Sequence, residues 1–178
     1  MTIFRPNFSD IDEGDVEQLL TSGQAEGVQV EFKRDIYGNS DSDKKEYLKD
    51  ISSFANTAGG HLLIGIDENQ GIASAISPFQ GDPDAALQRL EQIARTAIEP
   101  RVFGIQMKAV PLTSGGSIFV IRIPKSWNPP HRVSFQGTNR FYLRSSAGAH
   151  EASVEELRAI FSNGPACRIE CLLTSMTE

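Results

Sequence analysis

Hydrophobic and polar positions alternate along the chain with two different periods, which predict both helices and strands. In residues 28–33 ("VQVEFK") apolar side chains occupy every second position, which is typical of a strand with one buried face. In residues 42–60 ("SDKKEYLKDISSFANTAGG") they recur every three or four positions, which indicates a helix that ends at the Gly59–Gly60 turn. Residues 61–67 ("HLLIGID") are almost entirely apolar, so we expect a central strand covered on both sides.

Capping residues and turn glycines predict further elements. Polar caps followed by apolar periodicity indicate helices over residues 12–21, 82–98 and 153–161. Alternating stretches on either side of glycine-containing turns predict hairpins over residues 103–124 and 132–145.

Together these elements predict an α+β (mixed α/β) fold, a single domain with one mixed sheet flanked by helices. We expect an N-terminal helical segment over residues 1–24, the domain itself over residues 25–161, and a loose C-terminal tail over residues 162–178. No internal repeat interrupts this order.

Length and composition fit one domain with a sizeable core. The chain has 178 residues, of which 39% are hydrophobic and 22% are charged. It contains no run of about 18 apolar residues, so we expect no membrane-spanning helix. The N-terminus is acidic and lacks an apolar signal core, and the two cysteines, Cys167 and Cys171, have no histidine nearby. We therefore expect a cytoplasmic protein with two reduced thiols.

Charge is distributed unevenly, although the net charge is −6. Residues 1–100 contain 8 basic and 18 acidic residues, whereas residues 101–150 contain seven basic residues and no acid. Such an acid-free stretch creates a local positive field, unless its cations are scattered over several faces and only balance the acidic half. The seven cations are Arg101, Lys108, Arg122, Lys125, Arg132, Arg140 and Arg144.

Three acids lie near the ends of predicted strands and could share one site. Glu31 is on the polar face of its strand, Glu26 lies in the turn that enters it, and Asp67 ends the central strand. Converging carboxylates repel one another unless a cation neutralises them, and magnesium, which prefers oxygen ligands, suits that role. Lys33 points to the same face as Glu31 and could hold a phosphate. A solvated strand face and a turn aspartate explain the same spacing.

Other catalytic motifs are missing from the sequence. There is no GxxxxGK[ST] phosphate-binding loop, and the histidines form no HExxH zinc motif. His131, which follows Pro129–Pro130, is either a ligand contact or a packed loop residue. A P-loop nucleotide site and a zinc hydrolase are therefore not supported.

Several stretches together resemble the Schlafen AlbA-like (AlbA_2) domain family in order and spacing. They are "EGVQVEFK", "YLKDISSFANTAGGHLLIGID", "PPH" and "NRFYLRSSAGAHEASVEEL", and they extend from about Glu26 to Phe161. The most specific part lies between Phe54 and Asp67, where the family typically reads FANT-x-GG followed by a strand that ends in an aspartate.

The resemblance implies a site and a class of partner. In the Schlafen ribonucleases of animals, two glutamates and an aspartate form an acidic catalytic site, and the matching positions are Glu26, Glu31 and Asp67, with Lys33 beside them. Bacterial relatives are commonly described as DNA-binding or ATP-binding. Animal Schlafen cores place two such lobes around RNA, so a homodimer of this single lobe could supply the second. The zinc-binding Cys/His set of the animal cores is not visible here.

Two functions remain open from the sequence. The first is a metal-dependent nuclease acting on RNA, such as tRNA, or on single-stranded DNA. In it Glu26, Glu31 and Asp67 hold Mg²⁺ or Mn²⁺ and Lys33 helps to hold the phosphate. The second is a non-catalytic module that binds nucleic acid or a nucleotide within a regulatory or defence assembly. A protein–protein scaffold is a third reading that the acidic first hundred residues would suit.

In the nuclease hypothesis, side chains of the predicted 132–145 hairpin contact the nucleic acid. We expect Arg132, Arg140 and Arg144 to track the phosphate backbone. We expect Tyr142, together with other aromatic residues of the hairpin, to stack on unpaired bases, although about half of these rings must point into the core.

Overall fold

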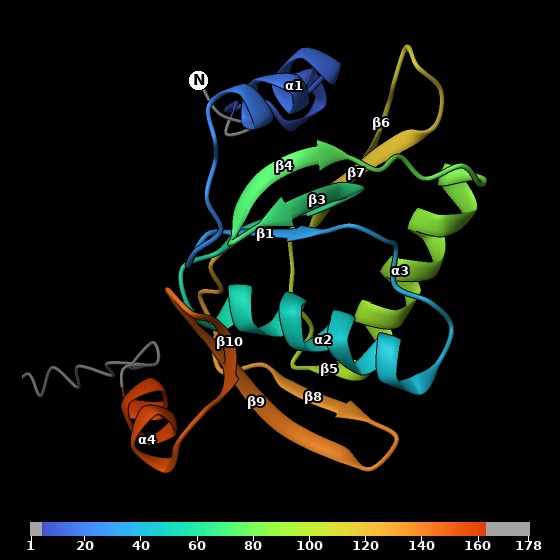
Figure 1. Cartoon of the computed structure of the whole chain (residues 1–178). Helices are drawn as coiled ribbons and strands as arrows, with labels where there is room; N and C mark the ends of the chain where they lie inside the picture. The colour runs from blue at the N-terminus through green and yellow to red at the C-terminus, as the bar shows by residue number, and fades with distance from the viewer. Residues whose placement is uncertain (1–4, 163–178) are drawn as a thin grey trace, which may run out of the picture.

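Helix α2 (Asp41–Asn56) lies between two four-stranded sheets, and this layering organises the remaining elements (Figure 1). The computed structural model describes residues 5–162, and in this part of the chain no helix has the length and apolarity needed to cross a membrane. The other elements, in chain order, are η1 (Phe8–Asp10), α1 (Glu13–Thr21), β1 (Val30–Lys33), β2 (Gly60–Ile64), β3 (Ile66–Asn69), β4 (Ile72–Ile76), α3 (Pro83–Ala97), β5 (Ile98–Glu99), β6 (Gln106–Pro111), β7 (Ser117–Ile123), β8 (Arg132–Phe135), β9 (Thr138–Ser145), β10 (Gly148–Glu151) and α4 (Val154–Ser162).

The strands divide among three sheets. The first has the order β1-β2-β7-β6, with β1 parallel to β2 and the other neighbours antiparallel. The second, β10-β9-β8-β5, is wholly antiparallel, and β3 pairs with β4 alone. The predicted α+β domain and its two hairpins are confirmed, and the expected mixed sheet is the first of three.

Gly65 separates β2 from β3 and so ends the central strand early. Its φ of +99° lies in the left-handed region that favours glycine, and a Cβ at this position would lie 2.6 Å from Cδ1 of Ile118. The Gly65 N–H donates to the carbonyl of Lys33, while its own carbonyl accepts from Ser77. The chain therefore leaves the first sheet at this glycine, and Asp67 lies on β3 instead of at the end of the central strand.

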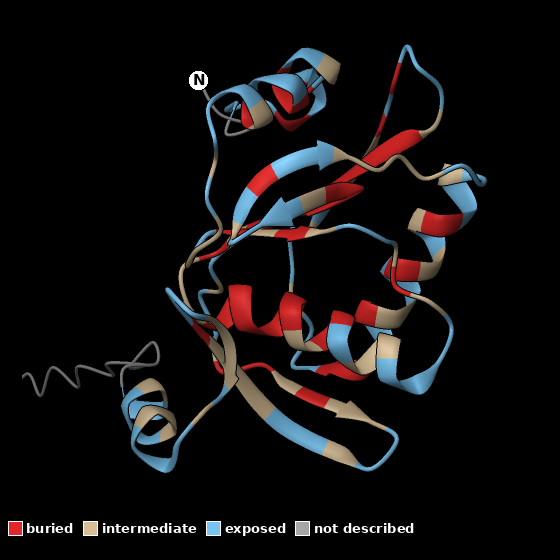
Figure 2. Cartoon of the chain, viewed as in Figure 1, coloured by how far each residue is buried: buried red, intermediate tan, exposed pale blue. Residues whose placement is uncertain are grey.

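Both faces of the first sheet are covered, as the apolar pattern of its central strand predicts. One face packs on α2 and α3 through side chains such as Leu62 and Phe119. The other face packs on α1 and the β3–β4 pair through side chains such as Leu63 and Val120. Buried positions are concentrated on α2 and the central strands, whereas α4 carries none (Figure 2). The predicted N-terminal helical segment thus packs directly on the sheet.

The helices begin where the sequence places capping residues. Asp12 caps α1, Asp82 caps α3 with Pro83 in the first turn, and Ser153 and Glu156 exchange hydrogen bonds at the start of α4. The three helices predicted from these caps are confirmed.

The predicted C-terminal tail lies outside the described residues, except that Ser162 ends α4. The reduced thiols expected at Cys167 and Cys171 fall in the same stretch, so they stay predictions.

Asn56 connects the end of α2 to the second sheet. Its Oδ1 accepts a hydrogen bond from the His131 N–H at 2.6 Å, and its Nδ2 donates to the carbonyls of His131 at 2.9 Å and Tyr142 at 3.0 Å. The side chain is buried. Backbone groups left without partners in such a site cost about 1–3 kcal/mol each, so this amide is a strong constraint on how α2 meets β8 and β9.

We predict that Asn56→Ala lowers the free energy of unfolding by about 2–5 kcal/mol, because it strips partners from buried backbone groups. Urea denaturation measures the change. Asn39→Ala is the matched control at an exposed position, and its effect should stay within about 0.5 kcal/mol. Equal stability of the two variants would show that this amide does not hold the second sheet.

Arg122 on β7 attaches the N-terminal segment to the first sheet. Its Nε donates to Nε2 of His61 at 2.9 Å, and its two Nη atoms donate to the carbonyls of Arg5 at 2.6 Å and Pro6 at 3.3 Å. The guanidinium also lies 5.0 Å from the centre of the Phe8 ring. Burial, and secondly the charge of Arg122, lowers the pKa of His61 to about 4, so the imidazole is neutral in the folded domain.

His61 should make the domain less stable in mild acid. Between its ordinary pKa of 6.5 and the lowered value of about 4, the unfolded chain binds a proton that the folded domain excludes, so stability is lost as the pH falls. The shift corresponds to about 3 kcal/mol. Between pH 7 and pH 4 the free energy of unfolding of the wild-type protein should fall by roughly this amount more than that of His61→Gln. Urea denaturation at each pH measures both. A difference that stays constant over this range would contradict the assignment.

Candidate functional site

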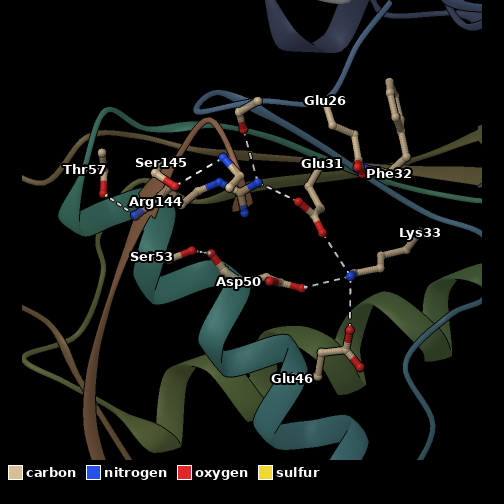
Figure 3. A network of polar contacts seen from close by, with 12 residues as sticks. Glu26, Glu31, Phe32, Lys33, Glu46, Asp50, Ser53, Thr57, Arg144 and Ser145 are labelled. Atoms are coloured by element: carbon tan, nitrogen blue, oxygen red, sulfur yellow. Dashed lines mark hydrogen bonds and ion pairs between the residues drawn. The ribbon is translucent and has the colours of Figure 1, made fainter. Parts of the chain in front are cut away.

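Strand β1 places Glu31 and Lys33 on the face that looks toward α2, because alternate residues of a strand point to opposite sides. The ammonium of Lys33 lies 3.0 Å from Oε1 of Glu31. It also reaches two acids of α2, with Oε1 of Glu46 at 3.0 Å and Oδ2 of Asp50 at 3.7 Å (Figure 3). One lysine thus links the first sheet to the helix beneath it.

Arg144 approaches the same cluster from β9 of the second sheet. Its Nη2 lies 2.5 Å from Oε2 of Glu31 and donates to the carbonyl of Gly27 at 3.2 Å. The guanidinium carbon lies 4.0 Å from the centre of the Phe54 ring, and the Arg144 backbone N–H donates to Thr57. The Arg144 side chain is 0% exposed, and Nη2 makes its hydrogen bonds, while Nε and Nη1 have no hydrogen-bond partner among the described residues.

The charges of this cluster are largely balanced within it. Burial alone would raise the pKa of Glu31, but hydrogen bonds from Arg144 and Lys33 lower it below the usual value, so Glu31 is ionised at neutral pH. Burial would lower the pKa of Lys33, but the charge of Asp50 and the contacts with Glu31 raise it, so the ammonium stays charged. Burial raises the pKa of Asp50 in spite of Lys33 and a 2.7 Å hydrogen bond from the Tyr37 hydroxyl.

Glu26 lies beside the cluster, where the chain enters β1. Its Oε1 accepts a hydrogen bond from the Phe32 N–H at 2.7 Å, and its own N–H donates to the carbonyl of Gly71. Burial raises the pKa of Glu26, and the negative charge of Glu31 adds to the rise. The charge of Glu31 thus acts on Glu26, and a site shared by the two carboxylates stays a prediction.

Asp67 is held separately on β3. Its partly exposed carboxylate pairs with Nη1 of Arg34 at 3.4 Å and accepts a hydrogen bond from the Glu68 N–H. Among residues 5–162, no group of three or more His, Cys, Asp or Glu side chains could hold a metal ion. The structure brings Glu31 and Lys33 together, places Glu26 at the backbone of Phe32, and leaves Asp67 with a partner of its own.

A divalent cation does not fit Glu31 in this arrangement. Lys33 occupies one carboxylate oxygen and Arg144 the other. A metal at Glu31 would have to displace either the ammonium of Lys33 or the buried guanidinium of Arg144, and the displaced cation would then lose this counter-ion. The Mg²⁺ or Mn²⁺ site at Glu26, Glu31 and Asp67 therefore stays a prediction that this geometry does not favour.

The expected phosphate contacts on the hairpin are engaged within the protein. The contact between Arg144 and a phosphate backbone stays a prediction that this geometry does not favour, because the Arg144 side chain is buried against Glu31. Arg132 pairs with Glu99 at 2.9 Å, and Arg140 pairs with Glu151. These two pairs are solvent-exposed, so each contributes little to stability, but both cations already have a partner.

The expected stacking residues also contribute to packing. Tyr142 and Phe135 are partly buried against the core around α2. Phe141 contacts Phe161 of α4 edge-on, with ring centres 6.1 Å apart. None of these three rings stands clear of the protein.

A surface that the sequence does not single out combines exposed rings with free cations. Phe103 and Trp127 are 70% and 73% exposed. Arg101 and Lys125 make no ion pair or side-chain hydrogen bond with any described residue. All four line one hollow of about 300 Å³, the Trp127 hollow, whose lining contains no acid. The acid-free stretch of residues 101–150 indicates a positively charged surface, but the sequence does not show which of its cations lack partners.

The fold is that of an α+β domain, and comparison of its sequence with known families identifies the family to which it belongs. The sequence profile of the Schlafen, AlbA_2 family matches residues 26–153, and the chain belongs to this family. The resemblance seen in the sequence is thereby confirmed. No curated protein sequence matches the chain significantly.

The chain is similar in structure to two solved proteins, and the first of them shows the same fold. The crystal structure of the DIP2311 protein from Corynebacterium diphtheriae is 20% identical, with a TM-score of 0.52, covering 77% of this chain and 29% of that one. The chain thus spans less than a third of that protein. The solution structure of an N-terminal domain from Nitrosomonas europaea is 22% identical, with a TM-score of 0.48, covering 65% of this chain and 74% of that one. Its parent protein is described as related to the ATP-dependent DNA helicase RecG.

We predict that Arg144→Met lowers the free energy of unfolding by about 3–5 kcal/mol, because Glu31 then keeps its charge with one cation fewer. Glu31→Gln should also destabilise, since it leaves the buried guanidinium without its counter-ion. The double variant should lose less stability than the two single variants lose together. We expect the difference to be about 1 kcal/mol or more in a double-mutant cycle measured by urea denaturation. Strictly additive losses would mean that the two side chains do not interact.

Proposed function

We propose that the domain is a nucleic-acid-binding module that contacts phosphate groups through Arg101 and Lys125 and requires no metal ion. The observation that carries this proposal is which of the seven cations in residues 101–150 have a partner within the protein. Arg101 and Lys125 are the two without a partner in the described chain, and both line the Trp127 hollow. The other five are Lys108 and Arg122, which donate to backbone carbonyls, and Arg132, Arg140 and Arg144, which pair with glutamates.

A cation with no internal counter-ion is suited to a phosphate. Its attraction for an anion is not offset by a partner that must first be released, and displaced counterions add to the binding free energy. Two such cations on an acid-free hollow give a local positive field within a chain whose net charge is −6. Membership of the Schlafen, AlbA_2 family supports nucleic acid as the source of the phosphates.

The acidic cluster is assigned a structural role in this proposal. Glu31 neutralises Arg144 and Lys33, and together they connect β1, α2 and β9. Metal-dependent cleavage is the second candidate, and it is favoured by the position of Glu26, which accepts a hydrogen bond from Phe32 in the strand that carries Glu31. Cleavage through these residues would require Glu31 to leave two cations that it contacts directly.

The binding proposal predicts that Arg101→Ala/Lys125→Ala weakens binding of a labelled RNA or single-stranded DNA at least tenfold at low salt, measured by fluorescence anisotropy. The slope of log affinity against log salt should fall by about 1.4, which is about 0.7 for each lost contact with a single strand. Arg132→Ala/Arg140→Ala is the matched control, because it removes the same charge from exposed residues that already have partners.

Equal weakening in both double variants would show that net charge, and not this hollow, determines binding. The same titration in Mg²⁺, in Mn²⁺ and in chelator should give one affinity and leave labelled tRNA intact. Cleavage that needs a metal and is lost in Asp67→Ala, a variant at a partly exposed position, would favour the nuclease and overturn the non-catalytic assignment.

A further inference from the structure

Two exposed aromatic side chains stand beside the free cations. The described part of the chain exposes five large hydrophobic side chains, and two of them, Phe103 and Trp127, line the Trp127 hollow. Exposed rings of this size leave apolar surface in water, and a flat partner that covers them recovers that free energy. Their position next to Arg101 and Lys125 pairs each ring with a cation two residues away in the sequence.

The Trp127 hollow is the middle of three adjoining hollows. It shares Arg101 and Phe103 with a hollow of about 410 Å³ beside α3. It shares Lys125 and Trp127 with a hollow of about 430 Å³ between the end of α2 and α4. Each ring and its neighbouring cation thus lie at a junction between two hollows. This serial arrangement suits an extended chain better than a single compact ligand.

We propose that the three hollows form a track for single-stranded nucleic acid, in which bases stack on Phe103 and Trp127 while Arg101 and Lys125 contact the adjoining phosphates. This inference rests on the proposed nucleic-acid binding and specifies its substrate class. Proteins that bind single strands combine such a basic groove with aromatic platforms, because every base offers a face for stacking.

The exposed rings distinguish a single strand from a duplex. In a duplex the faces of the bases are stacked on one another and are not available to a side chain, so a duplex would contact only the two cations.

The charge of the residues that line the track suits a polyanion. Its cations are Arg95, Arg101 and Lys125, and the only acid in the lining of the three hollows is Glu91, at the α3 end.

His131 also lines the Trp127 hollow. Its Nδ1 lies 2.6 Å from the carbonyl of Pro100, which can only accept, so Nδ1 carries the proton. The ring is buried, and Nε2 is closed to solvent and has no hydrogen-bond partner among the described residues. Burial also lowers the pKa of His131, which keeps the ring neutral. His131 therefore adds no positive charge to the hollow.

The single tryptophan of the chain makes the test direct. A uridine or thymidine oligonucleotide is titrated into the protein. The anisotropy of the oligonucleotide and the fluorescence of Trp127 are recorded together. Stacking of a base on the indole should quench the fluorescence with the same midpoint as the anisotropy change. Trp127→Ala and Phe103→Ala should each weaken single-strand binding about tenfold, with a smaller loss for Trp127→Phe, which keeps a ring. A duplex of the same length should bind more weakly and respond little to either change.

Ile72→Ala is the control, because Ile72 is an exposed apolar residue of β4 that lines none of the three hollows. All substituted rings are solvent-exposed, and an unchanged circular dichroism spectrum and melting temperature confirm that each variant folds. Binding that is unquenched and unaffected by both ring variants would overturn the track and leave the proposed function standing. No binding to any nucleic acid would overturn both.

A second copy of the chain is the competing occupant of these rings, and the same variants distinguish it. In sedimentation experiments the wild-type protein and Trp127→Ala should have the same association state. A dimer that disappears in Trp127→Ala, with nucleic-acid binding unchanged, would assign the surface to a homodimer and overturn the track.

Discussion

The ion pair between Arg144 and Glu31 connects the two large sheets across one end of α2. A guanidinium with a fully buried side chain requires a negative partner, because its desolvation costs several kcal/mol that only close charges and hydrogen bonds offset. Glu31 supplies that partner and also accepts Lys33, which reaches the acids of α2. Strand β1, helix α2 and strand β9 are therefore held by one charge cluster, reinforced by Asn56 at the C-terminal end of the helix.

This constraint separates the cations of the chain into two groups. Among the seven cations of residues 101–150, Lys108, Arg122 and Arg144 cannot leave their partners without leaving carbonyls unpaired or, for Arg144, a half-buried carboxylate. Arg132 and Arg140 have exposed glutamates as partners, so only these counter-ions compete with an external anion. Arg101 and Lys125 carry no such obligation, and the loops that hold them place both at the Trp127 hollow. A protein with a net charge of −6 can in this way present a local surface that attracts phosphate. The exposed rings of Phe103 and Trp127 give the same surface a second kind of contact.

Features governed by short-range physics could be predicted from the sequence. The caps at Asp12, Asp82 and Ser153 and the periodicity of α2 locate helices through contacts within a few residues, and the turn glycines locate the hairpins. The partner of Arg144 was not predictable, because Glu31 is 113 residues away in the sequence and nothing local marks the pair. Nor could periodicity show that Gly65 carries the chain out of the first sheet, or that Trp127 is exposed.

We propose that nucleic acid occupies the Trp127 hollow and leaves the Glu31 cluster untouched. Photo-crosslinking tests this most directly: a single strand carrying a photoreactive pyrimidine is bound to the wild-type protein and irradiated, and the modified peptides are identified by mass spectrometry. We expect crosslinks within residues 100–104 and 124–131, which contain the four aromatic and basic side chains of the hollow. Crosslinks concentrated within residues 26–33 and at Asp67 would contradict it and return the acidic residues to the centre of the function.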